Sequence, residues 1–113
     1  MKISKVAQLL DAKILTGENK LDTEVHSACG SDMMSDVLAH VKDQAVLLTG
    51  LVNPQVVRTA MMMDMCCIVF VRAKYPTQEM IDLAKENHIV MLHTKKRMYE
   101  ACGILYHSGL GRL

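Results

Sequence analysis

Between Val46 and Cys102 the chain repeats one pattern of hydrophobic and polar positions three times. A short apolar run is followed by a polar turn, and the turn opens a segment with apolar residues at helical spacing. The apolar runs cover residues 46–48, 67–71 and 89–92, and the turns cover residues 49–53, 72–77 and 93–94. Apolar runs that alternate with helices predict the strands of a parallel sheet. Such sheets bind ligands at the carboxyl ends of their strands, which is where the three turns fall.

The rest of the chain adds elements around this unit. The pattern predicts a helix over residues 5–11, an edge strand over 12–16, a weak strand over 24–29 and a helix over 33–41. Ser4 is the expected cap of the first helix, and the tail over residues 108–113 is expected to fray. We therefore expect one domain over residues 1–113, a three-layer α/β fold with a mostly parallel sheet flanked by helices.

Three cations follow Thr94, the residue expected to cap the last helix. Lys95, Lys96 and Arg97 would then occupy its first turn, where the helix dipole disfavours each positive charge by about 0.3–1 kcal/mol. Either these long side chains bend away into water, or the position holds an anion, because free amides and cations both attract phosphate or carboxylate.

Two neighbouring turns offer related chemistry. Gly50 would let a ligand approach the backbone, and Asn53 would cap the helix that opens at Pro54. Arg72 and Lys74 follow the next strand and add positive charge. The alternative is a well-capped turn between strand and helix with no ligand. The candidate ligand-binding residues are Gly50, Asn53, Arg72, Lys74, Thr94 and Lys95.

A third polar group precedes the predicted helix over residues 33–41. Ser31 and Asp32 stand at its start, and Ser35 and Asp36 follow one turn later. Their oxygens could bind a ribose, a metal-bound water or the backbone of a partner. Because serine and aspartate are also preferred helix caps, we expect Ser31 or Asp32 to cap this helix.

Composition narrows the classes of function. The chain has 13 basic and 12 acidic side chains, a net charge of +1, which argues against a dedicated nucleic-acid binder. Near-neutrality also favours self-association, so we expect a homodimer. No segment approaches the roughly 18 consecutive apolar residues of a membrane span, and the first residues do not resemble a signal peptide. We therefore expect no membrane association and a cytoplasmic location with reduced cysteines.

Sulfur-containing residues are concentrated between Met61 and Cys67. Thioethers and thiols suit soft metals such as Cu(I), but methionine also fills cores and adaptable interfaces, and packing is the interpretation we adopt. We expect no metal and no cofactor. Cys29 or Cys102 beside a histidine could act as a nucleophile, whereas buried cysteines are usually inert. Because no acid–base pair stands out, a cysteine-dependent enzyme remains only an alternative.

Three stretches of sequence resemble small stand-alone DRTGG-domain proteins. They are residues 30–39, 76–87 and 98–106, in the order expected for that family. The resemblance implies an α/β domain similar to the N-terminal domain of HPr kinase/phosphorylase, with a regulatory or oligomerising role. The chain has no P-loop, so it lacks the kinase function of that protein. It also departs from the Asp-Arg-Thr-Gly-Gly signature. Thr49 and Gly50 begin one corresponding turn, and residues 72–74 stand where a glycine pair is expected after the next strand.

These observations lead to one hypothesis. We expect a non-catalytic module for regulation, ligand sensing or oligomerisation that binds a small anionic ligand, and the resemblance makes an adenine nucleotide the preferred class. The candidate residues would allow backbone approach, present amides and neutralise phosphate. The alternatives are a structural subunit whose methionine-rich surface docks on a partner protein in a larger complex, and the cysteine-dependent enzyme.

Overall fold

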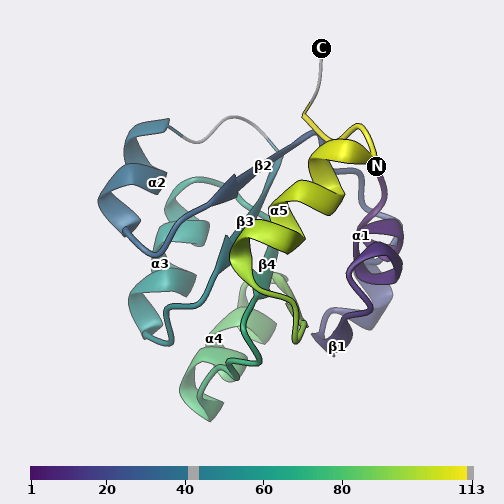
Figure 1. Ribbon diagram of the computed structural model, residues 1–113. Coiled ribbons are helices and arrows are strands. Elements are labelled where there is room, and N and C mark those ends of the chain that lie inside the picture. Colours follow the sequence, from purple (N-terminus) through teal and green to yellow (C-terminus); the bar gives the residue numbers. More distant parts are fainter. Residues whose placement is uncertain (41–43, 112–113) are drawn as a thin grey trace.

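A five-stranded sheet forms the centre of the molecule (Figure 1). The computed structural model describes residues 1–40 and 44–111. The strands are β1 (Lys13–Thr16), β2 (Ser27–Gly30), β3 (Ala45–Thr49), β4 (Cys67–Phe70) and β5 (Val90–His93). They lie in the order β1-β5-β4-β3-β2, with β2 to β5 parallel and β1 antiparallel to β5. The mostly parallel sheet expected from the apolar runs is confirmed.

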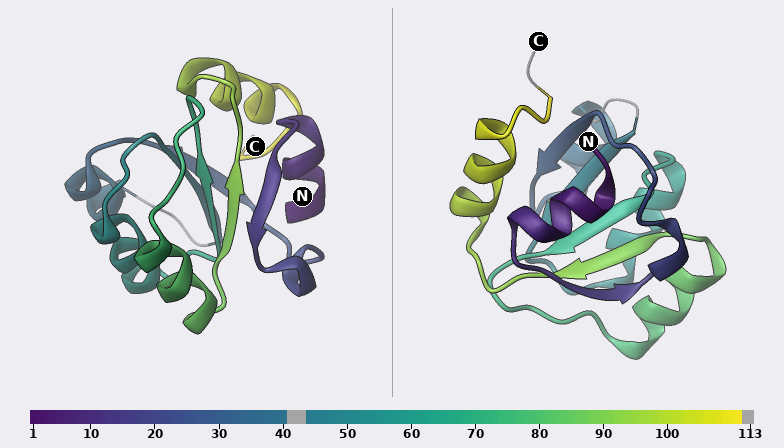
Figure 2. Two further views of the ribbon diagram at one scale, coloured as in Figure 1. Left: turned by 90° about the horizontal axis from the view of Figure 1, so that it is seen from below. Right: turned by 90° about the vertical axis from the view of Figure 1, so that its right-hand side faces the viewer.

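Helices cover both faces of this sheet (Figure 2). They are α1 (Ile3–Leu9), α2 (Met34–His40), α3 (Pro54–Met62), α4 (Gln78–Glu86) and α5 (Met98–His107), with a short 3-10 helix over Glu18–Lys20. Helices α1 and α5 lie on one face, and α2, α3 and α4 lie on the other. The three-layer α/β architecture is therefore as predicted.

Alternating side chains of each central strand enter two separate cores. Val46 and Leu48 of β3 pack toward α1 and α5, whereas Leu47 packs toward α2, α3 and α4. Successive strand residues point to opposite faces, and both faces are covered by helices. This is why the central strands appear in the sequence as unbroken apolar runs.

The first helix begins earlier than predicted and does not use Ser4 as its cap. Lys2 is the N-cap of α1 and makes no side-chain cap hydrogen bond. Instead, the amide of Ile3 donates to the carbonyl of Thr23 at 3.0 Å, and the amide of Ser4 donates to the carbonyl of Leu21 at 2.9 Å. Backbone carbonyls about twenty residues away therefore satisfy the helix start.

The last helix begins later than predicted. Its N-cap is Arg97, and Thr94 lies outside it. The Thr94 hydroxyl donates to the carbonyl of Leu10 at 2.8 Å and accepts the amide of Lys96 at 3.2 Å. The expectation that Lys95, Lys96 and Arg97 occupy the first helical turn is therefore wrong, because a long-range hydrogen bond removes Thr94 from the capping position.

The carboxyl-terminal tail is more ordered than its sequence suggested. Leu110 is 5% exposed and belongs to the core cluster beneath α5. Its amide donates to the carbonyl of Leu105 at 3.1 Å. The predicted fraying is therefore wrong as far as residue 111, and the last two residues lie outside the described part. Across residues 1–40 and 44–111, no helix has both the length and the apolar character needed to cross a membrane.

Candidate ligand-binding site

The register of the parallel strands brings four loops to one edge of the sheet. Gly30 pairs with Leu48, Thr49 pairs with Phe70, and Phe70 pairs with His93. The segments that follow β2, β3, β4 and β5 therefore lie side by side at the carboxyl edge. Most of the predicted site residues belong to these segments.

Asp32 joins the ends of three strands. Its Oδ1 accepts the Gly50 amide at 2.7 Å and the Thr49 hydroxyl at 3.0 Å, and its Oδ2 accepts Nη2 of Arg72 at 3.1 Å. We call these four residues the Asp32 network. Asp32 therefore binds loop residues instead of capping α2, while the Ser31 hydroxyl accepts a backbone amide two residues later at 3.0 Å.

Opposing effects act on the Asp32 carboxyl group. Burial raises its pKa, but the hydrogen bonds from Gly50 and Thr49 and the charge of Arg72 lower it, and the net shift is downward from the ordinary value. The carboxylate is therefore ionised at neutral pH and pairs with a guanidinium that is itself about half exposed. The positive charge of Arg72 is consequently partly neutralised within the protein.

Close approach and an unusual backbone conformation place the Arg72 side chain. A Cβ atom on Gly50 would overlap the Arg72 guanidinium, so a larger residue there would force the arginine side chain to move from its present position. Arg72 and Ala73 have φ of 59° and 57°, a left-handed conformation that favours glycine. Their amides donate to the carbonyls of Lys96 at 2.8 Å and Thr94 at 3.1 Å. The loop after β4 is thereby held against the loop after β5.

A separate hollow of about 270 Å³ opens at the carboxyl end of β5. Its lining comprises Leu10, Asp11, Lys13, Tyr75, His93, Thr94, Lys95 and Lys96. We call it the β5 hollow. The Tyr75 ring stacks on the His93 ring with centroids 3.8 Å apart and planes inclined by 17°. Lysines from β1 and from the loop after β5 thus surround an aromatic pair.

The predicted residues fall into two places. Gly50 and Arg72 belong to the Asp32 network, and Thr94 and Lys95 line the β5 hollow. Asn53 accepts the amide of Gln55 at 2.8 Å and caps α3, as expected. Lys74 is exposed, and the lining of the β5 hollow includes neither Lys74 nor Arg72.

Sequence reasoning missed Lys13, Tyr75 and His93 as possible site residues. Lys13 belongs to β1, which runs antiparallel to β5 and pairs with His93. The amino end of β1 therefore lies at the same edge as the carboxyl ends of the other strands. The sequence predicted an edge strand over residues 12–16, which contains Lys13. It did not predict the direction of that strand, and the direction is what places Lys13 at the carboxyl edge.

The match to a known family covers most of the chain. The model of the DRTGG domain matches residues 5–108. The chain belongs to the DRTGG domain family. A solved structure also resembles this DRTGG domain, with a TM-score of 0.75 and 14% sequence identity. It is the crystal structure of the CBS and DRTGG domains of the regulatory region of Clostridium perfringens pyrophosphatase, complexed with the activator diadenosine tetraphosphate.

The structural match covers nearly all of this chain but only part of the other protein. The alignment with the pyrophosphatase region covers 97% of the DRTGG domain described here and 48% of the other chain, so this chain spans about half its length. At this identity the likeness establishes the fold. None of the curated proteins compared matches the chain.

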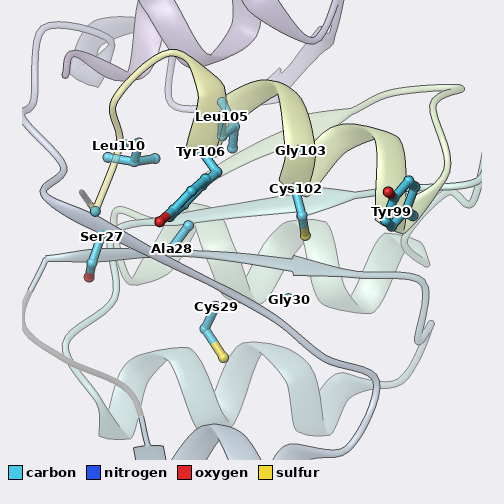
Figure 3. A pocket seen from close by; sticks show the side chains of 11 residues that line it. Ser27, Ala28, Cys29, Gly30, Tyr99, Cys102, Gly103, Leu105, Tyr106 and Leu110 are labelled. Atoms are coloured by element: carbon cyan, nitrogen blue, oxygen red, sulfur yellow. The ribbon is translucent and has the colours of Figure 1, made fainter.

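A larger cavity of about 720 Å³ lies between β2 and α5 of the DRTGG domain (Figure 3). We call it the α5 groove. Ala28 and Gly30 contribute from β2, and Tyr99, Gly103 and Tyr106 contribute from α5. None of the described residues that line the groove carries a charge. Tyr99 is 93% exposed and Tyr106 is 64% exposed.

The four cysteines of the DRTGG domain are free thiols. Burial raises the pKa of Cys29, Cys66, Cys67 and Cys102 above the ordinary thiol value. A raised pKa keeps each sulfur protonated at neutral pH, where a nucleophile needs the thiolate. Across the described ranges, no group of three or more histidine, cysteine, aspartate or glutamate side chains is placed to hold a metal.

Proposed function

We propose that this DRTGG domain is a non-catalytic regulatory module that binds an adenine nucleotide, or another small anionic ligand, at the carboxyl edge of its sheet. The observation that carries the proposal is the convergence of the four loops on that edge, where Lys13, Lys95 and Lys96 surround one hollow. Open α/β sheets bind ligands at this edge. The diadenosine tetraphosphate complex of the pyrophosphatase region makes adenine nucleotides the first class to test.

The six candidate residues take different roles in this proposal. Lys95 and Lys74 supply charge for phosphate, and Thr94 positions the backbone on which Lys95 stands. The Arg72 guanidinium, which pairs with Asp32 in the free protein, would also bind phosphate if the ligand displaced the Asp32 carboxylate. Gly50 lets the Arg72 guanidinium lie against the backbone and donates its amide to Asp32. Asn53 orders the first turn of α3.

The chemistry of the cysteines supports a non-catalytic module in the cytoplasm. Burial raises the pKa of the Cys29 and Cys102 thiols, so neither is an activated nucleophile. Free thiols persist in reducing compartments such as the cytoplasm.

Thermal unfolding in the presence of nucleotides tests the proposal. A ligand at a hundredfold excess over its Kd stabilises the folded state by about 2.7 kcal/mol, which raises the Tm of a domain of this size by roughly 10 °C. We expect such a rise with one or more of AMP, ADP, ATP and diadenosine tetraphosphate, and a smaller one with adenosine, which lacks phosphate. An unchanged Tm with all four nucleotides at millimolar concentration would show that the proposed ligand class is wrong.

We also propose that the domain forms a homodimer through the α5 groove. The groove is uncharged along its described lining, and β2 is an edge strand of the sheet, which favours pairing with another chain. Tyr99 and Tyr106 protrude on either side of Gly103, so the surface offers both a projection and a recess. A twofold axis would bring the tyrosines of each copy against the recess of the other. A different partner protein is the alternative occupant.

A further inference from the structure

His93 at the end of β5 carries a buried polar atom that the fold does not satisfy. The side chain is 5% exposed, and its Nε2 is buried with no hydrogen-bond partner among the described residues. A buried unsatisfied polar group is unfavourable and uncommon in folded proteins. Because an imidazole nitrogen can donate or accept a hydrogen bond, a bound ligand could satisfy it.

The β5 hollow around His93 has an excess of positive charge. Lys13, Lys95 and Lys96 line it together with one carboxylate, that of Asp11. Lys96 lies 3.9 Å from the carboxylate of Glu100, whereas Lys13 and Lys95 form no ion pair within the described part of the chain. Two exposed lysines without an ion pair therefore line the hollow, one from β1 and one from the loop after β5.

We propose that the β5 hollow is a phosphate subsite, in which the ammonium groups of Lys13 and Lys95 and Nε2 of His93 bind the oxygens of a phosphate ester. The phosphate subsite is a more specific form of the proposed function, and it depends on that function for the identity of the rest of the ligand. A phosphate monoester carries nearly two negative charges and three strong acceptor oxygens at neutral pH. Two ammonium groups and an imidazole N–H match that charge and that number of acceptors better than they match a carboxylate.

Tyr75 lies against one face of the His93 imidazole. Its ring covers that of His93, and the side chain is itself 51% exposed, so it can turn outward without leaving a core. Because Nε2 is buried, side chains around it must move before a phosphate can reach it, and the half-exposed Tyr75 ring against the imidazole is free to turn outward. Tyr75 stands in the same loop as Arg72 and Ala73, whose amides bind the loop after β5. Binding at the hollow should therefore change the environment of Tyr75 and His93 together.

Nuclear magnetic resonance titrations of the intact chain test the subsite with two probes, inorganic phosphate and ADP. We expect the ring signals of His93 and Tyr75 to shift with either probe. We also expect Lys13→Ala and Lys95→Ala each to weaken binding by about fivefold or more, because each loses a charge-assisted contact. Lys85→Ala removes an exposed lysine from α4, outside the hollow, and should leave the affinity unchanged.

The possible results separate the subsite from the proposed function. If ADP binds while the His93 signals stay fixed and the Lys13 and Lys95 variants bind normally, the phosphate subsite is wrong and the nucleotide proposal stands. If inorganic phosphate shifts His93 but no nucleotide binds, the subsite stands and the nucleotide proposal is wrong. If neither probe binds at millimolar concentration, both are wrong.

Discussion

Asp32 shows, at the scale of single residues, how tertiary partners can determine the role of a side chain. By its position before α2 it is a typical helix cap. In the folded chain it accepts hydrogen bonds from Gly50, Thr49 and Arg72, which arrive from two other loops. Hydrogen bonds to a charged acceptor contribute more than those between neutral groups. Asp32 is therefore expected to stabilise the carboxyl edge although it is about 44% exposed.

The replacement Asp32→Asn should make this contribution measurable. At neutral pH we expect a loss of about 1–2 kcal/mol in the free energy of unfolding, because the charged acceptor is removed. Folding lowers the pKa of Asp32, so the unfolded chain binds more protons than the folded one in the acid range. The stabilisation is therefore complete above the unfolded value, near 3.9, and is lost as pH falls through the folded value.

Urea unfolding of wild type and Asp32→Asn at neutral and at acid pH provides the measurement. The difference between the two proteins should shrink as the carboxylate is protonated. Asp36→Asn, an exposed substitution in the first turn of α2, is the control and should change stability by only a few tenths of a kcal/mol. A constant difference across the pH range would contradict the assignment.

At the scale of elements, the loop after β4 has a conformation that its residues do not favour. Arg72 and Ala73 both adopt positive φ, which is unfavourable by roughly 1–2 kcal/mol for each residue with a Cβ. These two residues lie within the segment 72–74, where the family resemblance leads one to expect a glycine pair. The conformation is kept without glycine because both amides bind the neighbouring loop and because the Arg72 side chain reaches Asp32.

Replacing Ala73 by glycine should relieve part of this strain. The gain in the left-handed region exceeds the extra entropy of glycine in the unfolded chain, so we expect Ala73→Gly to raise stability by about 0.5–1 kcal/mol. Ala39→Gly, at an exposed position in α2, is the matched control and should lower stability by about 1 kcal/mol. Equal destabilisation by both replacements in chemical denaturation would contradict this account of the loop.

At the scale of the whole molecule, the two proposed surfaces lie on different parts of the fold. The β5 hollow is at the carboxyl edge, beside β1, whereas the α5 groove flanks β2 at the opposite side of the sheet. Helix α5 follows the loop that carries Lys95 and Lys96, and its residues line the groove. Because the two linings share no residue, ligand binding and pairing can be tested independently.

Gly103 allows a direct test of pairing. A Cβ at this position would meet nothing within 4 Å, so the monomer accepts a side chain there. Sedimentation velocity should give a mass near twice 12.6 kDa for the wild type and a monomer for Gly103→Glu, which places a charge in an uncharged interface. Gly103→Ala, the size control, should remain dimeric. A monomeric wild type, or a dimeric Gly103→Glu, would show that the groove is not the interface.

Much of the fold was predictable because buried strands require runs of apolar residues, which can be recognised in the sequence. The apolar runs that became β3, β4 and β5 are covered by helices on both faces, and Asn53 with Pro54 marked the start of α3 correctly. The carboxyl edge followed from the alternation of strands and helices. The start of α5 was not predictable, because it depends on a hydrogen bond from Thr94 to Leu10, 84 residues away.

The amino-acid sequence by itself determined the α/β class, the strands of the central sheet and the resemblance to the DRTGG family, because these depend on residue type and spacing along the chain. Only the tertiary structure decided that Arg72 pairs with Asp32, 40 residues away, and that Lys13 lies in the hollow with Lys95. The pairing of β1 with β5 and the stacking of Tyr75 on His93 were decided there too. The physical reason is that hydrogen bonds, charges and ring contacts depend on distances in space, and local patterns of polarity record only whether a position is buried.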